Sequence, residues 1–204
     1  MRVFLCLVLL VSIADAAFAA GAPEQTVRDA QRAIDTKNAD LFEQLVDTKR
    51  ILNAATDMLL AEANKPDGQL PPLPALIISS VKDSQALAAL RDILAQEAHA
   101  FLRYGILSGN FAGTPDRSVR PGGILAPLLS DVSMGRKELR VAGPPAPDGQ
   151  ERVFLPVELK DHGNGNTYPL LLRLQRHPPD WRIVEVVNLP AIRHQVQAEA
   201  GARR

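Results

Sequence analysis

The chain has 204 residues, and its 23 Lys and Arg residues balance 23 Asp and Glu residues, so the formal net charge is zero. Hydrophobic residues make up 46% and charged residues 23% of the chain, which is typical of a globular protein and excludes a disordered or fibrous one. The charge balance also excludes a broadly basic nucleic-acid binder, because no excess positive charge is left to neutralise phosphates. At this length we expect one domain with a sizeable core.

The N-terminus has the pattern of a cleaved secretory signal. Arg2 gives a positive start, an apolar run extends from Val3 to Ile13, and Ala17-Phe18-Ala19 supplies an A-x-A exit. The run is shorter than the roughly 20 residues of a membrane-spanning helix, although an uncleaved anchor stays open as the alternative. We predict cleavage after Ala19, a single domain over residues 20–204, and a periplasmic or secreted protein without a membrane span. Cys6 would leave with the leader, which suits an oxidising compartment.

Helical periodicity dominates residues 23 to about 130. A first helix is predicted from Pro23 to Lys37, because proline is favoured in the first turn, where its missing N–H costs nothing. Asn38 or Asp40 can start a short second helix, and Asp47-Thr48 can cap a third. The further segments are a third-helix stripe from Ile51 to Leu59, a short apolar segment over 75–81, a long helix over about 85–107, and an apolar segment over 124–129.

From about Lys137 the hydrophobic period changes from helical to alternating, which is the signature of β-strands. Short turns rich in Pro, Gly, Asn and Asp separate the runs, so neighbouring strands should pair antiparallel. After Pro190 the pattern predicts a short terminal helix to about residue 200. The expected fold is therefore α+β, with N-terminal helices packed on one face of a four-stranded antiparallel meander over about residues 137–188.

Two stretches of the chain resemble a known superfamily. One runs from Ala33 to Phe42 and continues through Leu45-Val46-Asp47, and the other runs from Trp181 to Pro190. They resemble the opening helix pair and the last strand of small bacterial exported domains in the nuclear-transport-factor-two-like (cystatin-like, SnoaL-like) superfamily. The resemblance implies a curved sheet wrapped around a helix, and members include isomerases, dehydratases and non-enzymatic binding or dimerisation modules. The helical segment from about residue 48 to 135 is longer than the compact members have.

The sequence carries no motif for a metal, a cofactor or a catalytic nucleophile. It has no nucleophile elbow, P-loop or dinucleotide-binding glycine pattern. The segment from Asp161 to Asn166 lacks the alternating acids of a calcium loop and is predicted as a hairpin turn. The histidines are scattered without ligand spacing, so we expect no metal site and no cofactor. They are His99, His162, His177 and His194.

Three residues are candidates for acid–base chemistry. Glu97 and Tyr104 belong to the long predicted helix, and Glu185 belongs to the last strand. If the side of Trp181 and Ile183 faces the covered side of the sheet, Glu185 points into a cavity; if Val184 and Val186 face inward, Glu185 is solvated. A carboxyl group in an apolar pocket has a raised pKa and can act as a general acid or base.

Arg173, Arg176 and Arg182 fall on adjacent predicted strands and are candidates for an anion-binding patch. The alternative is a charged outer sheet face with Glu158 and Glu185 as cross-strand partners. Because the faces expected to point inward are nearly all aliphatic, we predict a non-catalytic module of the cell envelope that binds a protein or a small apolar ligand. Two alternatives stay open: a small cavity enzyme of isomerase or dehydratase type, and an oligomeric accessory subunit such as a homodimer.

Overall fold

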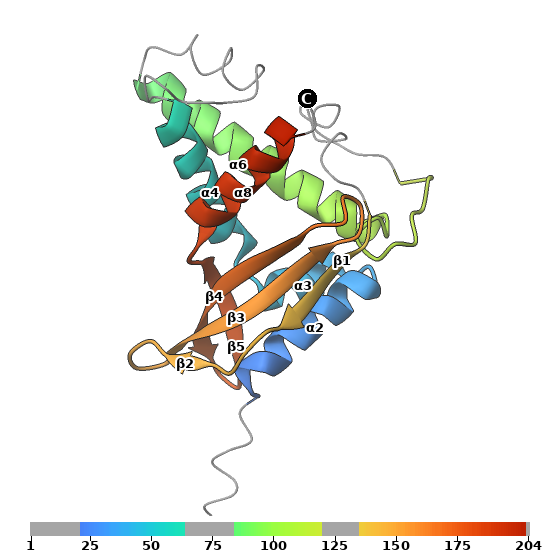
Figure 1. Cartoon of the computed structure of the whole chain (residues 1–204), viewed down its shortest axis with the longest axis vertical. Helices are drawn as coiled ribbons and strands as arrows, with labels where there is room; N and C mark the ends of the chain where they lie inside the picture. The colour runs from blue at the N-terminus through green and yellow to red at the C-terminus, as the bar shows by residue number, and fades with distance from the viewer. Residues whose placement is uncertain (1–20, 64–83, 120–134, 203–204) are drawn as a thin grey trace, which may run out of the picture.

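The computed structural model describes residues 21–63, 84–119 and 135–202, and these residues form an α+β fold (Figure 1). The predicted fold class is confirmed; the leader and the apolar segments at 75–81 and 124–129 lie outside the described residues. The helices are α2 (Pro23–Asp35), α3 (Ala39–Leu45), α4 (Thr48–Ala63), α6 (Ser84–Leu107) and α8 (Leu189–Ala202). The strands are β1 (Lys137–Val141), β2 (Ala146–Pro147), β3 (Arg152–Asp161), β4 (Thr167–His177) and β5 (Asp180–Val186).

The helices begin where local chemistry favours a start. α2 has Pro23 in its first turn, with Glu24 near its N-terminus and Arg32 in its last turn, an order of charges that suits the helix dipole. The side chain of Asn38 accepts the N–H of Leu41 at 2.9 Å and caps α3. Asp47 accepts the N–H of Arg50 at 3.2 Å at the start of α4. The predicted starts of these three helices are therefore confirmed.

The sheet is antiparallel, with strand order β1-β3-β4-β5 and with β2 paired to β3 beside β1. The predicted meander is confirmed, and β2 is an additional short strand. Its segment was predicted as a turn because Pro144 and Pro145 precede it and Pro147 lies within it. Pro156 of β3 falls between the residues that pair with β1 and those that pair with β2, so its missing N–H interrupts neither ladder.

A bulge in β5 decides which of its side chains face the core. Leu174 pairs with Ile183 whereas Arg173 pairs with Glu185, so Val184 is an extra residue on β5. Ile183 before the bulge and Val186 after it therefore both face the core side of the sheet. Glu185 falls on the opposite side, next to Arg173. Of the two orientations that the sequence left open, the structure has the one in which Glu185 points away from the core.

One hydrophobic core lies between the sheet and the helices α2 and α3, which cover the same face of the sheet (Figure 1). The C-terminal end of α6 closes this core with Ile106, and Phe111 follows in the next turn. Trp181, near the start of the edge strand β5, is partly buried and packs against this core. The fully buried sheet residues are Leu155, Val157 and Leu174. Each large apolar side chain buried here stabilises the fold by roughly 1.5–3 kcal/mol.

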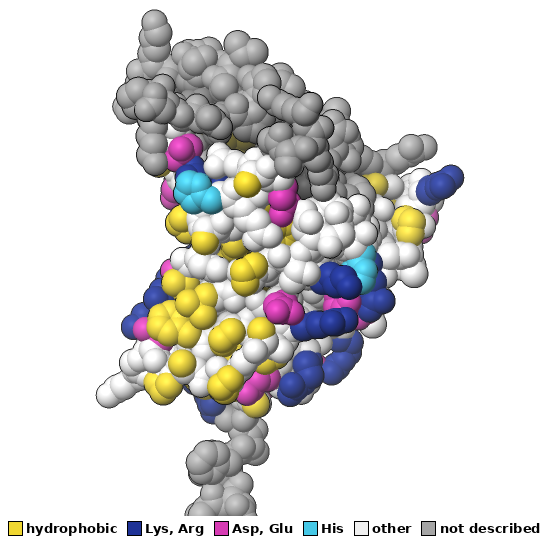
Figure 2. Space-filling model, viewed as in Figure 1, with side chains coloured by type: hydrophobic (Ala, Val, Ile, Leu, Met, Phe, Trp, Pro, Cys, Tyr) yellow, Lys and Arg dark blue, Asp and Glu magenta, His cyan; other side chains and the backbone are white. Residues whose placement is uncertain are grey.

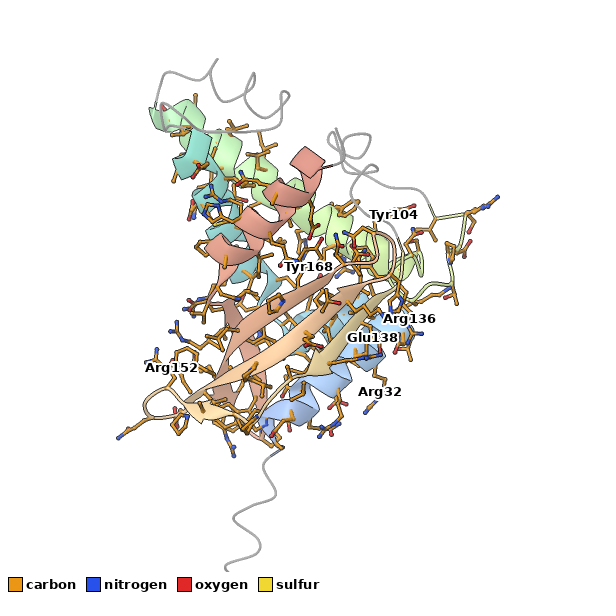
Figure 3. All side chains as sticks on the ribbon, in the orientation of Figure 1. Arg32, Tyr104, Arg136, Glu138, Arg152 and Tyr168 are labelled. Atoms are coloured by element: carbon orange, nitrogen blue, oxygen red, sulfur yellow. The ribbon has the colours of Figure 1, made fainter. Side chains whose placement is uncertain are left out.

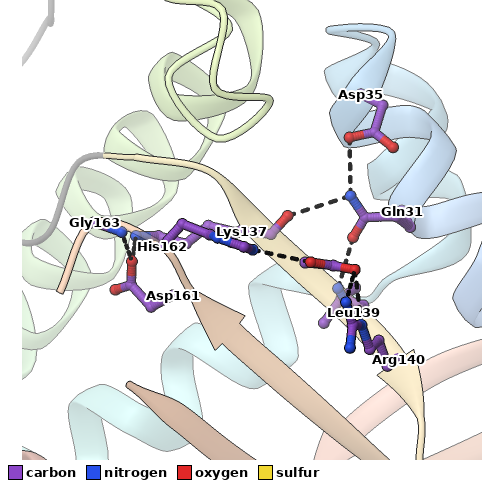
Figure 4. Close-up of polar contacts among 9 residues, drawn as sticks. Gln31, Asp35, Lys137, Leu139, Arg140, Asp161, His162 and Gly163 are labelled. Carbon is purple, nitrogen blue, oxygen red and sulfur yellow. Dashed lines mark hydrogen bonds and ion pairs between the residues drawn. The ribbon is translucent and has the colours of Figure 1, made fainter. Parts of the chain in front are cut away.

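Both edges of the sheet are occupied by other parts of the chain. On β1, the side-chain oxygen of Gln31 accepts the N–H of Leu139 at 2.7 Å, and its amide group donates to the carbonyl of Lys137 at 3.2 Å (Figure 4). The N–H of Lys137 donates to the carbonyl of Phe111. On β5, the N–H of Asp47 donates to the carbonyl of Ile183 at 2.8 Å. A glutamine side chain and the segment before α4 thus take the place of neighbouring strands.

Candidate ligand-binding site

An apolar groove lies between α4, the end of β5 and the start of α8. Its volume is about 350 Å³, and eight of the ten described residues that line it are apolar. These are Ile51, Ala54, Met58, Val184, Val186, Val187, Leu189 and Pro190, and Arg50 and Glu185 complete the lining. The α4 residues share one face of the helix, because positions three, four and seven apart lie on the same side. A largely apolar hollow of this size with few polar groups has the form of a small-molecule site.

Two contacts hold α8 where it forms one end of this groove. Asn188 accepts the N–H of Leu171 and donates to the carbonyl of Pro169, both at 2.8 Å, so it fixes the junction between β5 and α8 to strand β4. Further along α8, the guanidinium of Arg193 forms an ion pair with Glu62 of α4. Their side chains are only 12% and 16% exposed, so this pair is largely removed from water. The groove therefore depends on a buried charge pair between two helices.

The two charged residues of the groove have unequal surroundings. Glu185 forms a close ion pair with Arg173, which also donates to Asp148 at 2.7 Å and stacks on the ring of Phe154 at 5.0 Å. Arg50 approaches Glu185 only to 3.9 Å, and its side chain is 55% exposed. A separation of 3.9 Å is too long for a hydrogen bond. The Glu185 carboxylate is thus already engaged by Arg173. The Arg50 guanidinium donates no hydrogen bond to a described residue, so its N–H groups can bind another acceptor.

A larger, polar cleft of about 740 Å³ lies at the other end of β5, against α2, α3 and the β4–β5 turn. Most of its carboxylates have cationic partners. Arg103 of α6 donates to Glu43 at 2.8 Å and to Asp40 at 3.0 Å, and these hydrogen bonds raise the pKa of Arg103. His99 lies 3.0 Å from Glu43, and Arg32 pairs with Asp29 at 2.5 Å. The cleft's charges therefore largely satisfy one another and tie α6 to α3.

The candidate acid–base residues do not share a cavity. Glu185 lines the apolar groove, whereas Glu97 and Tyr104 lie on α6 and line neither the groove nor the polar cleft. Figure 3 places Tyr104 at the same end of the sheet as Tyr168, away from the end that carries Arg152. The structure thus distributes the three candidates over separate places instead of assembling them around one substrate.

The three candidate arginines make three separate contacts. Arg173 lies on the outer face of the sheet, opposite α2 and α3, between Glu185 and Asp148. Arg176 stacks over the ring of Trp181 at 5.4 Å. Arg182 lines the polar cleft and donates to the carbonyl of Glu43 at 3.2 Å. Their charges are therefore used in different contacts, and the structure does not bring them together as one anion-binding cluster.

A polar cluster that sequence analysis missed joins α8 to the β3–β4 hairpin. The hydroxyl of Tyr168 donates to Glu199 at 2.9 Å and accepts from Asn164 at 2.8 Å, while Asn166 donates to the same carboxylate at 2.5 Å. Burial raises the pKa of Tyr168. All the acceptors are engaged by neighbouring side chains, so this cluster serves to hold α8. Glu199 lies more than 30 residues from Asn166 and Tyr168 in the chain, so no local pattern could have connected it to the hairpin.

Comparisons with known proteins give no assignment: no family model, curated protein or solved structure matches the chain. The resemblance to the nuclear-transport-factor-two-like superfamily therefore stays a prediction. Within residues 21–63, 84–119 and 135–202, no cluster of three or more His, Cys, Asp or Glu residues is placed to hold a metal ion. None of the helices in these ranges is long and apolar enough to cross a membrane.

Proposed function

We propose that the protein is an exported, non-catalytic binding protein whose apolar groove takes a small apolar ligand. The observation that carries this proposal is the groove itself, because eight of its ten described lining residues are apolar and most of them are only partly buried in the folded chain. Apolar surface left in contact with water is unfavourable, and filling it with an apolar ligand releases that cost. Val184 is buried, and Ile51 and Val186 pack against the edge of the core, whereas Ala54 and Pro190 at the rim of the groove are exposed.

The surroundings of Glu185 support binding over acid–base catalysis. A general base needs a free carboxylate within reach of the substrate, normally with a second polar group that stabilises the developing charge. The carboxylate of Glu185 instead lies against the guanidinium of Arg173, which pairs in turn with Asp148. Glu97 and Tyr104 lie outside the groove. We therefore expect Glu97→Gln to leave both the fold and ligand binding unchanged.

Ligand binding can be tested with decanol, a neutral chain of suitable size. At about 30 Å³ for each non-hydrogen atom, the groove holds about a dozen such atoms. Titration calorimetry should detect decanol binding to the native chain. Ala54→Phe should weaken it at least about tenfold because the ring fills the groove, whereas Ala89→Phe, at an exposed position on α6, should not. Circular dichroism would check that both variants fold. Equal affinities in the two variants would contradict the proposal.

The outer face of the sheet favours a second candidate function, contact with a protein partner. No described helix covers this face, and Figure 2 shows apolar side chains gathered over β2, β3 and β4. Phe154, Pro156 and Leu171 contribute to it, since they alternate with the buried residues of their strands. Light scattering over a wide range of protein concentration would test for a second copy. A constant monomer mass would exclude self-association through this face.

Export can be tested separately from binding. The leader pattern predicts that material purified from the native host begins at Ala20, because Ala17-Phe18-Ala19 is the expected cleavage signal. N-terminal sequencing of that material gives a direct answer. A chain that begins at Met1 and stays in the cytoplasm would contradict the exported part of the proposal and leave the binding part to be judged by calorimetry.

A further inference from the structure

We infer that the groove selects an anionic amphiphile, namely a single aliphatic chain that carries a carboxylate, and that Arg50 receives the carboxylate. The inference rests on the proposed function of the groove and adds the chemical class of the ligand. Three observations carry it: the place of Arg50 in the lining, the state of its guanidinium, and the apolar path that leads away from it.

Among the described residues, the charged groups around the groove leave the Arg50 guanidinium without a close partner. Glu185 is engaged by Arg173, and Asp148 is engaged by Arg173 at 2.7 Å and approached by Arg152 at 3.8 Å. Three arginines thus share two carboxylates, if Arg50 is counted at its 3.9 Å distance from Glu185. No acceptor among the described residues makes a hydrogen bond with the Arg50 guanidinium. A ligand carboxylate can therefore bind this group bidentately, a geometry that guanidinium and carboxylate share.

The walls of the groove suit an aliphatic chain beyond that carboxylate. Arg50 stands in the first turn of α4, and Ile51, Ala54 and Met58 follow along the helix toward its C-terminal half. Val186 and Leu189 line the groove from the β5–α8 side. Methionine adapts its unbranched, polarisable side chain to irregular apolar partners, which suits a flexible chain. A molecule with a charged head and an apolar tail matches this order, in which a cation is followed by apolar side chains. A uniformly polar molecule would make no favourable contact with the apolar walls.

The head group can be tested with three probes that share one chain length: decanoate, decanol and decyltrimethylammonium. Calorimetry at low salt should give decanoate about a fivefold higher affinity than decanol, with the cationic probe weakest, because only decanoate pairs with Arg50. Raising the salt concentration should weaken decanoate binding, since half-exposed charges are screened. Octanoate should bind about tenfold more weakly than decanoate, because each buried methylene contributes to affinity.

Matched variants separate the role of Arg50 from general charge effects. Arg50→Gln should lower decanoate affinity about fivefold and leave decanol affinity unchanged. Lys49→Gln removes the same charge from the adjacent position of α4, which does not line the groove, and should change neither affinity. Failure of all three probes to bind would overturn the proposed function. Binding of decanol and decanoate with equal affinity, or tightest binding of decyltrimethylammonium, would overturn the assignment of the head group and leave the apolar groove standing.

Discussion

The two hollows beside β5 differ in how far the chain itself pairs their polar groups. The cleft at the start of the strand is the larger, at about 740 Å³, and Arg103, Arg32 and His99 pair with its carboxylates. The groove at the end of the strand has about 350 Å³ and largely apolar walls, and no described residue accepts a hydrogen bond from its Arg50 side chain. On the proposed function the smaller hollow is the binding site, so volume alone does not identify it. Groups already satisfied by the chain offer a ligand little, whereas unsatisfied ones give it affinity.

The largest expected effect comes from releasing α8 from α4, which removes one end of the groove. Arg193→Met removes the ion pair between α8 and Glu62 of α4, and loss of one member of a largely buried pair costs about 3 kcal/mol. Urea unfolding should report this loss of free energy of unfolding, and decanol affinity should fall because α8 carries one end of the groove. The double variant Arg193→Met with Glu62→Leu should recover most of the stability. A double variant as unstable as the single one would show that the pair does not act through its charges.

A smaller effect is expected from a substitution at the polar cleft. Arg103→Ala removes the hydrogen bonds to Glu43 and Asp40 that tie α6 to α3. We expect a loss of about 1 kcal/mol in the free energy of unfolding, since the pair is partly exposed and solvent weakens it. Affinity for decanol and decanoate should stay unchanged, because none of these residues lines the groove. A drop in ligand affinity with intact stability would mean that the polar cleft, not the apolar groove, is the binding site.

The smallest expected effect concerns Glu138, whose carboxylate lines neither hollow. Its titration serves as a reference for acid titrations of the whole protein. Hydrogen bonds with His162 at 2.9 Å and Arg140 at 2.7 Å lower the pKa of Glu138 to about 2. A carboxyl group whose folded-state pKa is lowered adds stability above its unfolded pKa, near 4.5, and loses it as the pH falls toward 2.

Glu138→Gln should therefore lower the melting temperature slightly at neutral pH, with the difference from the native chain vanishing by about pH 2. Thermal unfolding followed by circular dichroism across this pH range measures it. Glu158→Gln, which removes an exposed carboxylate on the neighbouring strand β3, serves as the control. A difference that grows toward acid pH would contradict the assigned direction of the pKa shift.

Local patterns predicted the elements well because their causes are local. Asn38 and Asp47 cap the helices that follow them, and the alternation from Val153 to Lys160 predicts β3. The exceptions are set by partners distant in the chain. The pairing of Ala146 with Phe154 makes a strand of a proline-rich turn, and the bulge at Val184 exists only relative to β4.

The candidate site was less predictable than the fold for the same reason. Ile51 and Met58 were assigned to the amphipathic stripe of a helix, and nothing in the stripe distinguishes a covered face from an open one. Whether the face is covered depends on where α8 docks, and that is fixed by Arg193 with Glu62 and by Asn188 with β4. No local sequence pattern marks Arg50 as a ligand-binding residue, since its proposed role depends on its distance from Glu185 after folding.

The occupied edges of the sheet limit how this protein can meet its own copies. An exposed edge strand is a template on which another chain can add a strand, and repeated addition leads to fibres. Here Gln31 engages Leu139 and Lys137 at one edge, and Asp47 engages Ile183 at the other. Addition of a strand would first have to displace these contacts. With a single cysteine, the chain can form no internal disulfide bond. The side chain of Gln31 therefore helps to prevent polymerisation through β1 at high protein concentration.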